Sequence, residues 1–87
     1  MPGRIRTVKD FLYVFVHNFY VKKFAERLKE LREDRGLSMG ELGEKIGSNH
    51  SIIGRWERGV HIPSIYWLVV LADFFKVSAD DLLGRDN

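Results

Sequence analysis

Apolar and charged positions alternate with helical spacing from residue 24 onward. Phe24, Leu28 and Leu31 stand four and three positions apart, and almost every residue between them is charged. This pattern is typical of a helix that buries one face. Gly36 follows the pattern and is the expected end of the helix, because glycine readily adopts the left-handed conformation common at that point.

Four further helices are expected downstream, and each follows a residue whose side chain can cap a first turn. The expected helix over 65–75 is apolar on most sides, as is typical of a helix in a core or at an interface. The caps and helices are Ser38 before 39–46, Asn49 before about 50–58, Ser64 before 65–75, and Ser78 before 79–83.

Residues 1–23 precede this pattern and are compatible with two structures. Phenylalanines recur at every fourth position from Phe11, and Thr7 and Asp10 have the spacing of a capping box, which together favour a helix. The aromatic and β-branched run over 11–16 would also suit a strand. We expect the helix.

The apolar residues of this extension need a covering surface. A soluble monomer rarely leaves so many aromatic side chains exposed, so we expect them to pack on the rest of the chain or on a second chain. The apolar stretch over 11–21 is interrupted by His17 and is too short to span a membrane. A third interpretation is that the natural start lies near Val21 and that the preceding residues are translated leader.

Composition limits the classes of function. The 87 residues, of which 45% are hydrophobic, suffice for one small folded domain, and the absence of cysteine is consistent with a cytoplasmic protein. Net charge is +2, but it is uneven: +4 over residues 1–35 and −2 over residues 63–87. A basic amino-terminal half is compatible with a polyanionic partner.

Two short predicted helices with a glycine turn between them lie between residues 37 and 59. Gly43 is small enough for the helices to cross closely, and Gly47 permits the turn. We expect the inward-facing side chains to be Leu42, Ile46, Ile53 and Trp56, and the outward-facing ones on the second of these helices to be His50, Ser51, Ile52 and Arg55.

This segment resembles the helix-turn-helix of the Cro and lambda-repressor type, also called the xenobiotic-response-element family. RLKELREDRGLS, ELGEKIGSNHSIIGRWERG, IPS and VSADDLLG match the family pattern in order, over about residues 24–84. The resemblance implies an all-α, five-helix DNA-binding domain at 24–84. Residues 1–23, the aromatic-rich extension for which we expect a helix, lie before the part that resembles the family, and residues 85–87 follow it as a tail. The resemblance also implies a cytoplasmic bacterial or phage repressor that binds palindromic operator DNA as a homodimer, with the third helix in the major groove.

The resemblance also assigns roles to individual residues. Met39 departs from the family, which often has glutamine at that position, and Gly40 stands where a helix former is usual. The implied DNA-binding residues are Asn49 and Arg58 near phosphates and His50, Ser51, Ile52 and Arg55 at base edges. Arg32 and Glu57 match a family ion pair that joins the first and third helices. Arginine can bind guanine O6 and N7, whereas isoleucine can contact only a thymine methyl group.

Other chemistry has little support in the sequence. His17, His50 and His61 are scattered without metal-ligand spacing, and no nucleophile–base pair is evident, so we expect no metal, no cofactor and no enzyme activity. Asp80 and Asp81 are expected to be first-turn helix charges. The alternative function is an antitoxin-type interaction module that binds DNA secondarily, with the aromatic extension as the arm that binds the protein partner.

Overall fold

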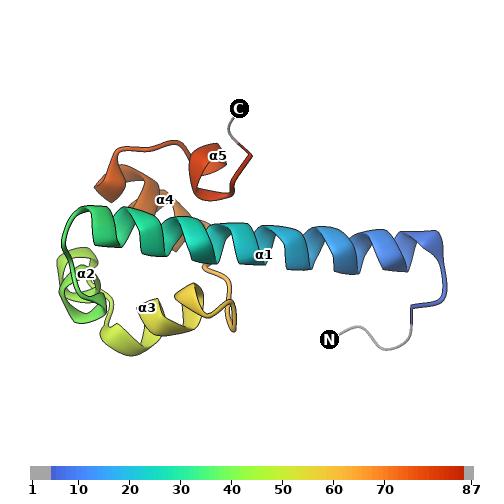
Figure 1. The fold of residues 1–87 in the computed structure, drawn as a ribbon, viewed down its shortest axis with the longest axis horizontal. Helices are drawn as coiled ribbons and strands as arrows, with labels where there is room; N and C mark the ends of the chain where they lie inside the picture. The colour runs from blue at the N-terminus through green and yellow to red at the C-terminus, as the bar shows by residue number, and fades with distance from the viewer. Residues whose placement is uncertain (1–4, 86–87) are drawn as a thin grey trace.

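A computed structural model describes residues 5–85, and all regular structure in that part of the chain is helical (Figure 1). The all-α prediction is therefore confirmed. Four short helices gather around the carboxyl-terminal half of one long helix, whose other half projects away from them (Figure 1). The helices are α1 (Val8–Asp34), α2 (Met39–Ile46), α3 (His50–Glu57), α4 (Ile65–Phe75) and α5 (Ala79–Leu82).

The extension and the first expected helix form one continuous helix, α1. The Thr7 hydroxyl caps it by accepting a hydrogen bond from the Asp10 backbone N–H at 3.1 Å. The Asp10 carboxylate accepts from the Arg6 N–H, rather than completing the expected capping box with Thr7. No glycine or proline interrupts the chain between the cap and Gly36. The helix expected for the extension is confirmed from Val8 onward, and the strand alternative for 11–16 was wrong. Residues 1–4 of the extension and 86–87 of the tail lie outside the described residues.

Side-chain caps begin the other four helices as predicted, and the bounds of α2 and α4 match the expected ranges. The helices α3 and α5 each end one residue earlier than expected, which is within the usual variation of helix ends. The four caps are Ser38, Asn49, Ser64 and Ser78.

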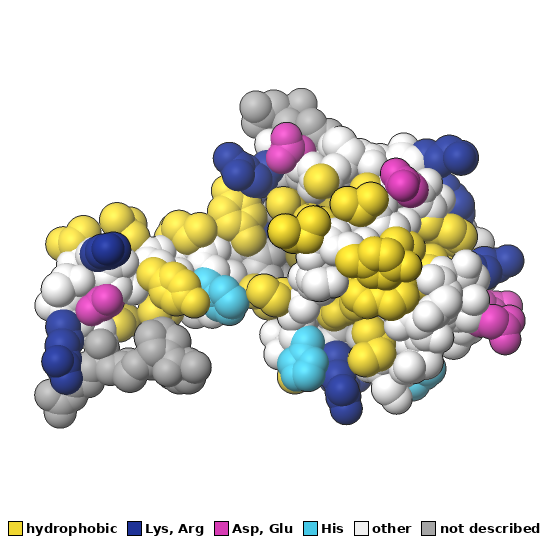
Figure 2. Space-filling view, turned by 180° about the vertical axis from the view of Figure 1, so that it is seen from behind, with side chains coloured by type: hydrophobic (Ala, Val, Ile, Leu, Met, Phe, Trp, Pro, Cys, Tyr) yellow, Lys and Arg dark blue, Asp and Glu magenta, His cyan; other side chains and the backbone are white. Residues whose placement is uncertain are grey.

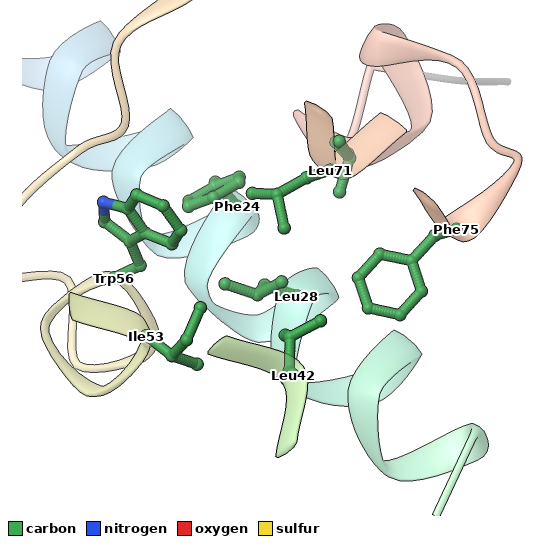
Figure 3. Close-up of a cluster of buried hydrophobic side chains, with 8 residues drawn as sticks. Phe24, Leu28, Leu42, Ile53, Trp56, Leu71 and Phe75 are labelled. Carbon is green, nitrogen blue, oxygen red and sulfur yellow. The ribbon is translucent and has the colours of Figure 1, made fainter. Parts of the chain in front are cut away.

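One apolar cluster holds the helices together, and it begins at Phe24 rather than in the extension. Trp56 lies inside it, as the sequence predicted, so its ring is not a surface platform for bases. Figure 3 shows side chains from α1, α2, α3 and α4 converging in this cluster. The buried members are Phe24, Leu28, Leu42, Ile53, Trp56, Leu71, Phe75 and Leu82.

Two ion pairs attach α1 to its neighbours. The Arg32 guanidinium binds Glu57 through two hydrogen bonds of 2.6 and 2.9 Å, and its third nitrogen donates to the Leu37 carbonyl oxygen at 2.7 Å. Arg27 binds Asp81 of α5 through bonds of 3.2 and 2.8 Å. Each carboxylate raises the pKa of its arginine chiefly by hydrogen bonding, so both guanidinium groups stay charged.

The helices α2 and α3 approach most closely at Gly43. A Cβ atom added there would lie 2.6–2.9 Å from the backbone of Asn49, closer than side-chain carbons pack against backbone. The turn between the helices passes through Gly47, whose φ of +82° suits glycine, and the Ser48 N–H donates to the Gly43 carbonyl oxygen at 2.7 Å. The expected roles of both glycines are confirmed.

We expect Gly43→Ala to destabilise the fold by about 1–3 kcal/mol, because the new methyl group forces α2 away from the start of α3. Gly40→Ala is the matched control in the same helix. Its Cβ would meet only the Ser38 hydroxyl at 3.9 Å, so it should gain about 1 kcal/mol in helix propensity. Urea unfolding followed by circular dichroism measures both. Equal effects of the two substitutions would contradict the role of the close approach.

We expect Glu57→Ala to destabilise the fold by about 3 kcal/mol, because it leaves the buried Arg32 guanidinium without its partner. The two side chains are only 9% and 3% exposed. Thermal melting of the single and double variants of this pair is the measurement, and additive losses would show that the residues do not interact. Glu33→Ala, at the exposed neighbouring position, serves as the control and should have little effect.

Candidate nucleic-acid interface

The helix α3 has one buried and one exposed side. Ile53 and Trp56 face the core and Gly54 is buried as well, while the exposed residues are His50, Ser51 and Arg55. The buried side is held by the apolar cluster, and Glu57 at its end is held by Arg32. The exposed side therefore has a fixed orientation relative to the rest of the fold, which is what a helix that enters a DNA groove requires.

Asn49 caps α3 through its side-chain oxygen, which accepts from the Ile52 backbone N–H at 3.0 Å. This bond uses only the carbonyl oxygen of the side chain. The two donors of the amide NH₂ group are not spent on the cap, and Asn49 itself is exposed. The residue thus combines a structural role with hydrogen-bond donors at the amino-terminal end of α3.

Ile52 faces outward less than the sequence predicted. It is only partly exposed and packs against the edge of the apolar cluster. Its position on the flank of α3, between the buried Ile53 side and the exposed Arg55 side, explains this. Ile52 offers only part of its side chain to an approaching molecule, unlike His50, Ser51 and Arg55.

Arg58 closes the carboxyl end of α3 and folds back along the helix. A Cβ atom added at Gly54 would lie 2.9 Å from a terminal nitrogen of Arg58 and 3.6 Å from the Met39 sulfur. The missing side chain of Gly54 therefore leaves the space in which the Arg58 guanidinium lies, next to the first residue of α2. This role of Gly54 cannot be read from the sequence alone, because it depends on a contact between the ends of two helices.

The first turn of α2 is closed by its own side chains. Ser38 and Glu41 form a reciprocal capping box, with bonds of 3.0 and 2.8 Å. The hydrogen bond from the Ser38 backbone N–H lowers the pKa of Glu41. These bonds occupy two N–H groups at this helix end, and the Arg58 guanidinium lies near it, because that guanidinium and the Met39 sulfur both border Gly54.

Two other kinds of site are absent from residues 5–85. No group of three or more histidine, aspartate or glutamate side chains lies close enough together to hold a metal ion. No helix in this part of the chain has both the length and the apolar composition to cross a membrane.

Comparison with known proteins identifies the architecture. A helix-turn-helix family model matches residues 28–82, which include all of α2 to α5 and the packed end of α1. No solved structure matches the chain at a significant level.

Several curated regulators are similar over the same region. The uncharacterized HTH-type transcriptional regulator YobD of Bacillus subtilis is 39% identical over 61 residues, covering 70% of this chain and 54% of YobD. The HTH-type transcriptional regulator AnsR of the same organism is 36% identical over 62 residues, covering 71% and 53%. The HTH-type transcriptional activator BcrR of Enterococcus faecalis is 33% identical over 65 residues, covering 75% and 32%.

The chain thus spans between about a third and about half of the length of these relatives. The matched region contains the two crossed helices, the cluster that holds them and the exposed side of α3. The chain therefore belongs to the helix-turn-helix family of the Cro and lambda-repressor type, the xenobiotic-response-element family.

Proposed function

We propose that this protein is a sequence-specific regulator of transcription that represses by binding a palindromic DNA site as a homodimer. The observation that supports it best is the fixed, exposed side of α3, held by the core and by the Arg32–Glu57 pair. Repression rather than activation rests on the family resemblance alone, and one relative is named an activator. The proposed role is binding rather than catalysis.

We assign the exposed side chains of α3 to two kinds of DNA contact, base edges and backbone phosphates. Arg55 carries a planar guanidinium that can bind guanine O6 and N7 together, and His50 and Ser51 can reach base edges from the first turn of α3. Ile52 touches a thymine methyl group with the part of its side chain that is exposed. Asn49 donates to a backbone phosphate through its amide group.

Arg58 is the proposed phosphate contact at the junction of α2 and α3. Many family members have glutamine where this chain has Met39, and the thioether of methionine is at best a weak acceptor. The Arg58 guanidinium lies beside this position because Gly54 leaves room for it. A cation there replaces the missing polar contact and adds charge attraction for phosphate.

The homodimer follows from the size of the reading surface and from the exposed extension. One helix of eight residues reads few base pairs, so selectivity requires two copies on two half-sites. The projecting half of α1 carries exposed apolar side chains that its own domain does not cover. A second copy can cover them.

A second function is supported by the same exposed helix. In an antitoxin-type module, the apolar extension would bind an unrelated protein, and DNA binding would be secondary. Purification of the tagged full-length protein discriminates the two functions, because the module would carry a stoichiometric partner from its own organism and the regulator would not.

The primary test of the proposed function is selection of bound sequences from a random DNA pool. A two-fold symmetric consensus is the expected result. Enrichment of no sequence, or of an asymmetric one, would contradict a dimeric regulator that reads half-sites.

We expect Arg55→Ala to weaken binding to the selected site by about 1–3 kcal/mol and to relax preference at one base pair in each half-site. The reason is loss of the paired contact to guanine. Titrations by fluorescence anisotropy on selected and random DNA provide the measurement.

Arg58→Ala is the matched control on the same helix end. It should weaken binding to both DNAs alike and reduce the salt dependence by about one phosphate contact. If Arg55→Ala also weakened both DNAs equally, Arg55 would be a phosphate contact rather than a base contact.

We expect a variant that begins at Lys22 to run as a monomer, or as a weaker dimer, in sedimentation at micromolar concentration. Every buried core residue lies at or beyond Phe24, so the shortened chain keeps its core and its helical spectrum. It should also bind the palindrome less tightly. Undiminished dimerisation would place the contact on α4 and α5 instead.

A further inference from the structure

The exposed large apolar side chains of residues 5–85 fall into two groups. Five lie on the α3–α4 loop and the start of α4, and the others lie on the extension. We call residues 8–20 of α1 the arm. Figure 2 shows hydrophobic side chains along the arm, with charged groups on this face only near its free end. The exposed members on the arm are Val8, Phe11, Leu12, Tyr13, Phe15, Val16 and Phe19.

Three phenylalanines of the arm form a straight, evenly spaced stripe. The rings of Phe11 and Phe15 stack with centroids 6.2 Å apart, and those of Phe15 and Phe19 stack at 6.1 Å. At about 100° per residue the three side chains span about 80° of the helix circumference. No lysine, arginine, aspartate or glutamate occurs between residues 11 and 21. A stripe with equal spacing on both sides of its middle residue is complementary to itself in antiparallel orientation.

We propose that two copies of this protein pair through antiparallel arms, with the two Phe15 side chains meeting at the two-fold axis. Phe11 of each copy then packs against Phe19 of the other. This pairing deepens the proposed function, on which it rests, by naming the surface that joins the two DNA-binding units.

The exposed apolar area is sufficient for a weak, specific interface. A fully buried aromatic side chain removes about 150–250 Å² from water, so three half-exposed phenylalanines offer on the order of 300 Å². With Val8 and Leu12 on the same side of the helix, each copy offers on the order of 500 Å², or about 1,000 Å² in total, which is near the lower bound for specific contacts. We therefore expect a dissociation constant in the micromolar range for the dimer without DNA.

The pairing leaves both α3 helices on the same side of the two arms. Val21 and Arg32 face the carboxyl end of α3, where Val21 lies against Gly59 and Arg32 binds Glu57. They lie about 120° and 100° around α1 from Phe15, so α3 is on a flank of the stripe rather than opposite it. A two-fold axis perpendicular to the plane of the two arms keeps that flank on one side for both copies, as a single face of DNA requires.

The register centred on Phe15 also gives a suitable spacing. Because Glu57 contacts Arg32 and Gly59 lies against Val21, the carboxyl end of α3 lies beside about residue 27 of α1. Twelve residues, or roughly 18 Å at 1.5 Å per residue, separate that point from Phe15 in each copy, so the carboxyl ends of the two α3 helices lie roughly 36 Å apart along the arms. Half-sites one turn of DNA apart require about 34–36 Å. Centring the pair on Phe11 or Phe19 would change the spacing by about 12 Å.

The absence of native cysteine allows a direct test in the full-length chain. Facing α-carbons of helices packed 8–10 Å apart are about 3.5–5.5 Å from each other, which overlaps the range of a disulfide. Phe15→Cys should form a covalent dimer under mild oxidation. Tyr13→Cys is the matched control, because Tyr13 is as exposed as Phe15, at 57% against 56%, but lies about 160° away around the helix. Equal cross-linking of both variants would overturn the proposal.

A mixture of Phe11→Cys and a tagged Phe19→Cys chain tests orientation and register. The antiparallel pair predicts that mixed dimers form at least tenfold more than either homodimer, because two Phe11 positions would be about 12 Å apart along the arms. Excess of the homodimers would mean parallel arms and would overturn the proposal. Circular dichroism of each variant verifies that the helix is intact.

DNA binding by the same variants separates this inference from the proposed function. The oxidised Phe15→Cys dimer should bind the selected palindrome and lose binding when about five base pairs, half a turn, are inserted between the half-sites. Cross-linking as predicted without binding to any palindrome would contradict the proposed function and leave the arm pairing intact. Palindrome binding by a protein that does not cross-link at position 15 would overturn only the arm pairing.

Discussion

The close approach of α2 to the start of α3 at Gly43 is the constraint on which the exposed side of α3 depends. The backbone of Asn49 lies where any side chain at position 43 would begin. This contact and the left-handed backbone conformation of Gly47 let α2 and α3 cross steeply after a very short turn. Because the crossing is tight, Leu42 of α2 and Ile53 of α3 reach one core while the first turn of α3 stays exposed.

The buried ion pair contributes geometry more than net stability. Removing two charges from water costs nearly as much as their attraction returns, so such pairs seldom add much free energy to a fold. The Arg32 guanidinium, however, uses its three nitrogens on Glu57 of α3 and the Leu37 carbonyl in the turn before α2. It therefore holds three segments at once. The pair of Arg27 and Asp81 fixes α5 in the same manner, but it is more exposed and so is screened by solvent.

Local signals in the sequence predict most of this fold. Helix bounds were predictable because serine and asparagine caps and glycine ends stand beside each apolar pattern, as at Ser38 and Gly47. The continuity of α1 was predictable in principle, since nothing that breaks a helix separates residue 8 from Gly36. The resemblance to the family begins near Phe24, but the helix α1 runs through that position without a break.

Contacts between distant segments were less accessible to sequence reasoning. Arg27 and Asp81 are 54 positions apart, and no local pattern relates them. The place of the Arg58 guanidinium depends on the missing side chain of Gly54 and on how closely α2 approaches, both of which are tertiary features. Ile52 was assigned outward from helical periodicity alone, and its partial burial reflects the width of the core edge beside it.

The exposed arm is part of α1, so the stability of α1 bears on the spacing of the two α3 helices in the proposed dimer. An isolated helix as short as the arm is only marginally stable in water. The packed half of α1, however, is already helical, so the helix can continue from it into the arm. The arm extends the molecule, which has a radius of gyration of 14.0 Å. A compact chain of this length has about 12 Å. Because arm and packed half are one helix without a hinge residue, a contact made near Phe15 sets the position of α3 in the partner as well as in its own chain. A flexible linker of the same composition could also join two copies. The distance between their α3 helices would then not be fixed before they bind DNA.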